Sequence, residues 1–120
     1  MIEKVVFDYL SAQLDVPVFM ELPEVPSESF PEWPAEFVLI EKVGESVRDH
    51  VRTSSFALQS YSLTSLFHAA ELDEQVREVM DVMAEETDVT RSHMSSNYNF
   101  TDTRTKRYRY QCVYDIVYIK

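Results

Sequence analysis

The chain contains 120 residues, of which 45% are hydrophobic and 27% charged, so it can bury one core, and we expect a single domain over residues 1–120. It has no apolar run of the ~20 residues that cross a bilayer, and its N-terminus carries charge where a secretion signal is apolar, so we expect neither a membrane protein nor an exported one. Twenty-one acidic residues against eleven basic ones give a net charge of −10, which disfavours nonspecific binding of nucleic acid.

The first third of the sequence predicts a helix and a brief extended segment, followed by a stiff loop and then a strand. Apolar residues at helical spacing predict a helix over residues 2–14, which Pro17 ends, and residues 18–22 form a brief extended segment. Four of the five prolines lie between residues 23 and 34. Because proline fixes φ and lacks an amide hydrogen, this segment must be a loop. The apolar run in residues 36–43 then predicts a central strand.

The middle of the chain predicts a hairpin and then a helix. Residues 44–46, with the only glycine of the chain, are the expected turn, and residues 47–63 the second strand of that hairpin. From residue 64 to residue 86 the apolar period changes to three or four, which predicts a helix with Thr64 or Ser65 as its N-cap. We expect its core face to contain Leu72, Val76, Val79 and Met83, and its acids to form a solvated face: Glu71, Asp73, Glu74, Glu78, Asp81, Glu85 and Glu86.

The last third predicts a second hairpin, with strands over residues 89–100 and 104–119 and a turn at residues 101–103. Alternation in the final strand places apolar and aromatic residues at even positions and mostly polar ones at odd positions. The element order is therefore α-β-β-β-α-β-β. It predicts an α+β fold, with a mainly antiparallel sheet and two helices packed on one of its faces.

Several kinds of chemistry are excluded or disfavoured by residue type and spacing. A single glycine leaves no room for a phosphate-binding loop of the P-loop or dinucleotide type. Asp49, His50 and the nearby serines do not suit nucleophilic catalysis, because adjacent strand residues point to opposite faces. Cys112 lies among aromatic residues and is expected to be a buried, inert thiol. We expect no catalytic residues, no cofactor and no metal site.

Two segments suggest protein contacts. Phe30 and Trp33 lie in the acidic proline loop, where either an interface or a small satellite core would explain them. The other segment holds four of the eleven basic residues: Arg104, Lys106, Arg107 and Arg109. A straight strand from residue 104 to residue 119 would span ~50 Å, which exceeds the size of such a domain, so it must bend or its first part must meet another chain.

The whole pattern resembles the tail-completion or tail-terminator proteins of long-tailed bacteriophages and prophages. The resemblance lies in the short first helix, the proline loop before the strand FVLIEK at residues 37–42, the helix SLFHAAELDEQVREVMDVM, and the closing hairpin that ends CVYDIVYIK. It covers nearly the whole chain but rests on element order, length and hydrophobic pattern, since there is no catalytic motif to match.

This resemblance implies a structural virion protein, not an enzyme, that forms a ring, commonly a hexamer. Such a ring completes the tail tube and joins it to the head connector, after assembly in the cytoplasm of the host bacterium. Its implied partners are further copies of itself, the tail-tube protein and the connector, with DNA only passing through an acidic channel that repels phosphate. The alternative is a small acidic intracellular adaptor or inhibitor that binds a basic partner protein.

Overall fold

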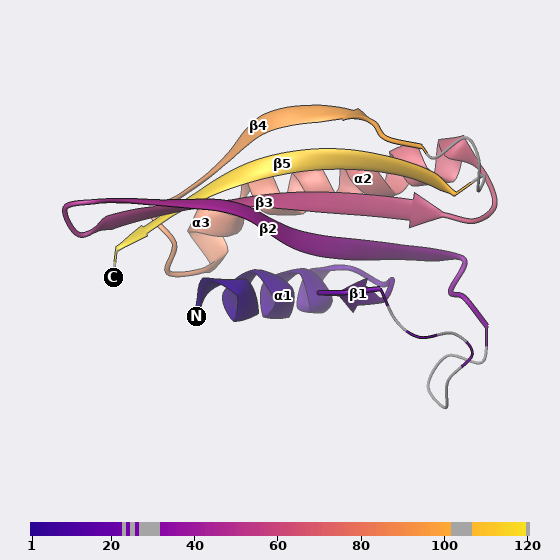
Figure 1. Cartoon of the computed structure of the whole chain (residues 1–120), viewed down its shortest axis with the longest axis horizontal. Coiled ribbons are helices and arrows are strands. Elements are labelled where there is room, and N and C mark those ends of the chain that lie inside the picture. The colour runs from indigo at the N-terminus through magenta and orange to yellow at the C-terminus, as the bar shows by residue number, and fades with distance from the viewer. Residues whose placement is uncertain (23, 25, 27–31, 102–106, 120) are drawn as a thin grey trace.

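The structure is a computed structural model of the whole chain, and it describes residues 1–22, 24, 26, 32–101 and 107–119 (Figure 1). It confirms the predicted α+β fold with a mainly antiparallel sheet. The elements are α1 (Ile2–Gln13), β1 (Val18–Phe19), β2 (Glu36–Arg48), β3 (Val51–Ser62), α2 (Leu66–Asp81), α3 (Met83–Glu86), β4 (Arg91–Asn99) and β5 (Tyr108–Ile119). This order agrees with the prediction except that the second helix is divided into α2 and α3.

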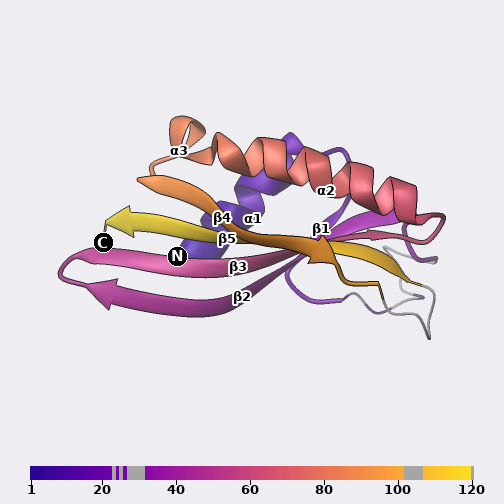
Figure 2. The same ribbon diagram turned by 90° about the horizontal axis from the view of Figure 1, so that it is seen from above.

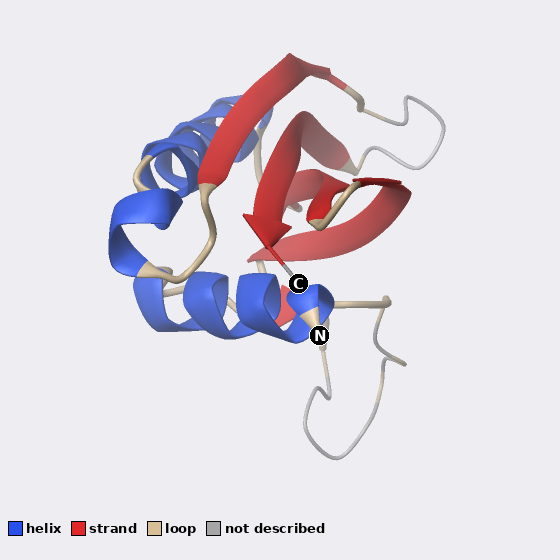
Figure 3. Ribbon diagram, turned by 90° about the vertical axis from the view of Figure 1, so that its left-hand side faces the viewer, coloured by secondary structure: helices blue, strands red, loops and turns tan. Residues whose placement is uncertain are grey.

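The five strands form one sheet in the order β1-β2-β3-β5-β4. Only the short pair β1 and β2 is parallel, while β2 with β3, β3 with β5 and β5 with β4 are antiparallel. The helices α1 and α2 pack on the same face of this twisted sheet (Figures 2 and 3). The opposite face has no helix over it in the described part of the chain.

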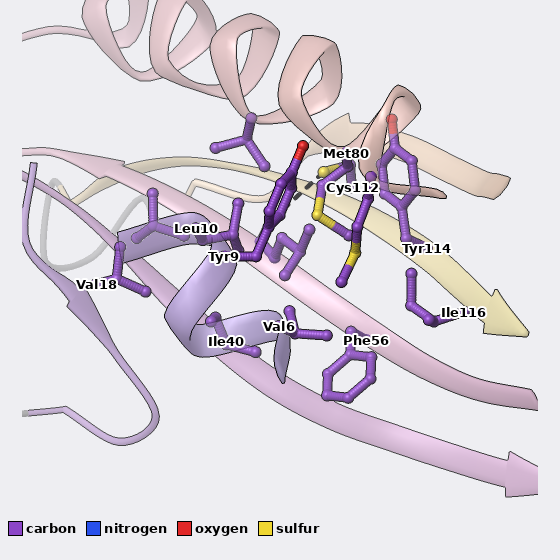
Figure 4. Packing of buried hydrophobic residues seen from close by; sticks show 14 of the residues in the cluster. Val6, Tyr9, Leu10, Val18, Ile40, Phe56, Met80, Cys112, Tyr114 and Ile116 are labelled. Carbon is purple, nitrogen blue, oxygen red and sulfur yellow. Dashed lines mark hydrogen bonds between the residues drawn. The ribbon is translucent and has the colours of Figure 1, made fainter. Parts of the chain in front are cut away.

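The core lies between the helices and the sheet, and strand alternation selects its members. Every second residue of the long strands points toward the helices, which supplies Val38, Ile40, Phe56, Leu58, Cys112, Tyr114 and Ile116. Facing them are the fully buried Val6 and Leu10 of α1 and Met80 of α2 (Figure 4). Val76 of α2 is fully buried as well. Of the four residues predicted for the core face of the second helix, Leu72, Val76 and Met83 are buried and Val79 is partly buried.

The turn of the first hairpin differs from the prediction. Gly44 lies inside β2, next to a β-bulge between Lys42 and Gly44, and the chain turns at Asp49 and His50 instead. Asp49 adopts a φ of 57°, which aspartate tolerates better than most residues because its short side chain bonds locally. The prediction of a turn at residues 44–46 was wrong because a glycine also suits a bulge.

The second helix also differs from the prediction. Ser65 is its N-cap, as expected, and accepts a hydrogen bond from the amide of His68 at 3.1 Å. The helix breaks at Val82, and α3 continues for only four residues. Asp73, which was expected on the solvated face, is buried. Its carboxylate accepts a hydrogen bond from Arg77 Nε at 3.0 Å and another from the side-chain amide of Asn97 in β4 at 2.9 Å.

The first prediction tests the packing face of α2. Val76→Asp should lower the free energy of unfolding by about 3 kcal/mol or more, because it buries a charge without a partner. Glu78→Lys, on the exposed side of the same helix, should change it by less than about 0.5 kcal/mol. Thermal unfolding followed by circular dichroism measures both, and equal losses would contradict the orientation of the helix.

Candidate subunit interface

The uncovered face of the sheet carries rows of side chains that cross several strands. In the first row Phe37 of β2 is the register partner of Tyr61 of β3, which is the partner of Arg109 of β5. The next row contains Gln59 and Gln111. Phe37, Tyr61 and both glutamines are buried even though no described helix covers them, so side chains on this face must cover one another.

We call the first row and its neighbours the aromatic–arginine cluster: Trp33, Phe37, Tyr61, Phe100, Arg107 and Arg109. Phe37 stacks on Tyr61 with ring centroids 4.6 Å apart, and Trp33 stacks on the other side of Phe37 at 5.8 Å. The guanidinium of Arg107 lies 4.7 Å from the centroid of Trp33, within the range of a cation–π contact. The cluster therefore joins the proline loop to the start of β5.

Arg109 is the polar centre of the cluster. Its guanidinium lies 4.1 Å from the ring centroid of Phe100, and its Nε donates to the carbonyl oxygen of Phe100 at 2.7 Å. Nη1 donates to the hydroxyl of Tyr61 at 2.8 Å and to Oε1 of Gln59 at 3.3 Å. These contacts hold Arg109 within its own subunit, so it supports the cluster more than it reaches outward.

The structure brings together three of the six predicted interface residues. Trp33, Arg107 and Arg109 share the cluster although up to 76 positions separate them in the sequence, while Phe30, Arg104 and Lys106 lie outside the described residues. Trp33 is half-buried against Phe37. It thus has the satellite-core contacts foreseen as one explanation, and part of its surface is still available to a partner.

The structure changes the length argument for the last strand. β5 begins at Tyr108, so it has 12 residues, and the longest dimension of the molecule is 44 Å. Such a strand fits within one subunit, and Arg107 contacts Trp33 of the same chain. The length of the last strand therefore gives no support to a contact between chains. What still favours such a contact is the positive charge of residues 104–109 and the exposed part of the cluster.

A second surface, which sequence reasoning missed, lies at the opposite end of the sheet. The β2–β3 hairpin extends beyond the helices there (Figure 1) and exposes three valines, Val43, Val47 and Val51. Ile119 at the end of β5 is exposed beside Val51 on the face without helices, whereas the register places Val47 on the opposite face. We call these four residues the hairpin surface. Their β-branched side chains were interpreted as ordinary strand residues, and only the late turn at Asp49 could have shown that they lie at the projecting end.

The hairpin is joined to the body by a charged network beside an open pocket of about 770 Å³. Glu45 accepts a hydrogen bond from the Tyr118 hydroxyl at 3.0 Å and lies 3.4 Å from Lys42 Nζ. These hydrogen bonds, that of Tyr118 first, lower the pKa of the Glu45 carboxyl. The pocket is lined by acidic and basic residues together, including Glu3, Arg52 and Asp88, so it selects no single ligand charge.

Ser55, Asp115 and His93 lie on neighbouring strands of the sheet, and the described contacts do not pair the serine with the histidine. Ser55 donates to Asp115 at 2.6 Å, so its proton is held by a carboxylate and not by a histidine base. His93 is the register partner of Asp115 but is exposed on the edge strand. Among the residues that the structure describes, no group of three histidines, cysteines or acids is placed to hold a metal ion.

The second prediction concerns Cys112. Burial raises the pKa of its thiol well above the ordinary value, and its side chain is fully buried between β5 and the helices. Because only the thiolate reacts quickly, the folded protein should resist a thiol reagent, and denaturant should release one reactive thiol per chain. Rapid labelling without denaturant would contradict this burial.

The third prediction concerns Trp33. Trp33→Ala should weaken self-association by about 2 kcal/mol, the size expected for a buried aromatic anchor, with only a small loss of monomer stability. Phe67→Ala is the matched control, since Phe67 is 69% exposed and lies on α2 away from the cluster. Sedimentation measures association and thermal unfolding measures stability. A large loss of stability with unchanged association would make Trp33 a core residue only.

Neither a protein-family model nor a curated protein matches this chain. None of the helices in the described ranges is long and apolar enough to cross a membrane.

Proposed function

We propose that this protein is a structural virion protein that forms a ring, completes the tail tube of a bacteriophage or prophage, and joins it to the head connector. The observation that carries the proposal is the presence of two chemically different surfaces at opposite ends of one sheet. The aromatic–arginine cluster lies where β2 and β5 begin, and the hairpin surface lies where β2 and β5 end (Figure 1).

Two unlike surfaces suit contacts in which one end of a subunit meets the other end of the next. Such head-to-tail contacts repeat around an axis and close into a ring when the rotation between subunits permits. The exposed valines of the hairpin surface would then cover the exposed part of Trp33 and Phe100 on the neighbour. Apolar side chains at the centre of a contact and charged ones at its rim are typical of protein interfaces.

Charge supports the same arrangement. The basic segment at residues 104–109 belongs to a C-terminal third with six basic and three acidic residues, while the chain as a whole carries −10. The neighbour's end of the sheet contributes Glu45 and, at the pocket beside it, Glu3, Glu86 and Asp88. A basic segment beside these acids would favour the correct neighbour, and a ring of acidic subunits would let DNA pass without binding it.

The fourth prediction reverses the basic segment. Changing Arg104, Lys106 and Arg107 together to glutamate should abolish self-association and capping of tail tubes even at low salt, because it places like charges at each junction. Wild-type association should weaken as salt rises. The same three residues changed to glutamine are the control, since they remove attraction without adding repulsion, and should lower association less. Native mass spectrometry gives the stoichiometry.

Mixing two defective variants tests the head-to-tail geometry. Val47→Glu damages the hairpin surface and leaves the cluster intact, whereas the triple glutamate variant does the opposite. A mixture of the two therefore retains one sound contact and should yield heterodimers but no rings. Rings from either variant alone would overturn the proposal. A wild-type protein that stays monomeric with tail components, yet binds a basic protein in a defined ratio, would favour the acidic adaptor instead.

A further inference from the structure

The open pocket of about 770 Å³ lies at the end of the sheet that carries the hairpin surface, and its walls come from three parts of the chain (Figure 1). Residues 1–5 at the start of α1 form the first wall, and residues 86–89 form the second. The hairpin and the end of β5 form the third wall. Ile119 lines the pocket and also belongs to the hairpin surface. The pocket therefore continues the surface that we propose to meet the neighbouring copy.

The mixed charge of the pocket is unevenly distributed over its walls. Between the first and third walls, Lys42 Nζ lies 3.4 Å from Glu45 and 3.7 Å from Glu3. Arg52 Nη1 lies 3.9 Å from the same Glu45 carboxylate. Two cations and two carboxylates therefore neutralise one another in this part of the pocket, and it has little charge left to offer a partner.

The second wall carries two carboxylates that are not neutralised in this way. Glu86 and Asp88 are exposed, and no cation of the described residues forms an ion pair with either of them. The pocket also has an apolar lining that includes Ile2, Val5 and Val89. A long side chain with an apolar stem and a cationic end suits this combination, because the stem covers the apolar residues while the charge lies beside the carboxylates.

Arg107, at the other end of the sheet, is a side chain of this kind. Its guanidinium lies 4.7 Å from the ring centroid of Trp33, and no carboxylate of the described residues forms an ion pair with it. Arg109 differs, since its nitrogens donate to three oxygen atoms of its own subunit. Arg107 is therefore the described cation of the cluster whose charge is left for a partner.

We propose that the pocket binds the Arg107 side chain of a second copy, with its guanidinium between Glu86 and Asp88. The occupant is a second copy because Arg107 and the pocket lie at opposite ends of a molecule 44 Å long, so Arg107 does not reach the pocket of its own chain. A guanidinium has donors on more than one edge and can bind two carboxylates at once. The inference rests on the proposed function, since it names the residues that meet in the head-to-tail contact.

Charge exchange between the two sides of the contact tests the proposal. Arg107→Glu should lower the affinity of self-association at least about tenfold at low salt, because it brings a third carboxylate into the pocket. Glu86→Lys with Asp88→Lys should lower it as much, since two ammonium groups then face Arg107. All three changes in one chain should restore the affinity to within about threefold of wild type, because the charges are again opposite. Sedimentation at up to about 100 µM measures the affinity, and circular dichroism verifies the fold of each variant.

A matched control separates this contact from a general effect of charge. Arg107→Glu combined with Glu74→Lys and Glu78→Lys has the same net charge as the restored variant, but its lysines lie on the exposed side of α2, so it should stay defective. Restoration by this control would overturn the inference.

The outcomes also separate the inference from the ring. Wild-type rings that persist after reversal of Glu86 and Asp88 would overturn the inference and leave the ring standing. Open chains of copies that show the predicted restoration would support the inference and overturn only closure into a ring. A wild-type protein that stays monomeric at about 100 µM would overturn both.

Discussion

The alternation of side chains along β5 is the constraint on which the rest of the structure depends. This strand lies between β3 and β4, and its even-numbered residues Cys112, Tyr114 and Ile116 fill the core beneath the helices. Its odd-numbered residues form the opposite face, where the Arg109 side chain donates hydrogen bonds to Phe100, Gln59 and Tyr61. A slip of one residue would exchange the two sets, burying Arg109 in the core and removing the centre of the aromatic–arginine cluster.

Polar contacts then fix the helix layer against this strand. The Tyr114 hydroxyl donates to Asp81 at 2.6 Å and lies 3.2 Å from the carbonyl oxygen of Arg77. Asp73, one turn of the helix away from Arg77, accepts from Asn97 on the edge strand. The acidic side of α2 is thus not simply a solvated surface. Two of its carboxylates bind side chains of β5 and β4, and these hydrogen bonds fix where the helix lies on the two strands. These contacts also support β4 from one face, which leaves its outer edge as the free side.

The sequence predicted the fold class, the element order and the buried faces, because hydrophobic periodicity reports which side of an element meets a core. It did not predict the position of the hairpin turn, because glycine serves both turns and bulges. It also missed the burial of Asp73, since a carboxylate at helical spacing gives no sign of a partner on a distant strand. It named Trp33 in one candidate interface segment and Arg107 and Arg109 in another, but it could not show that the two segments meet. Phe37 and Tyr61, which connect them, were interpreted as ordinary strand residues.

The two proposed ring surfaces lie on the same strands, so the shape of those strands sets the angle between successive subunits. β2 runs from the cluster to the hairpin surface and contains the bulge between Lys42 and Gly44. A bulge bends its strand and increases the local twist, so this feature turns the hairpin relative to the body. Gly44 itself is not required for space, since a Cβ there would meet nothing within 4 Å, and its φ is not positive. The extra residue of the bulge, more than the glycine, therefore directs the hairpin, and through it the curvature of any head-to-tail ring.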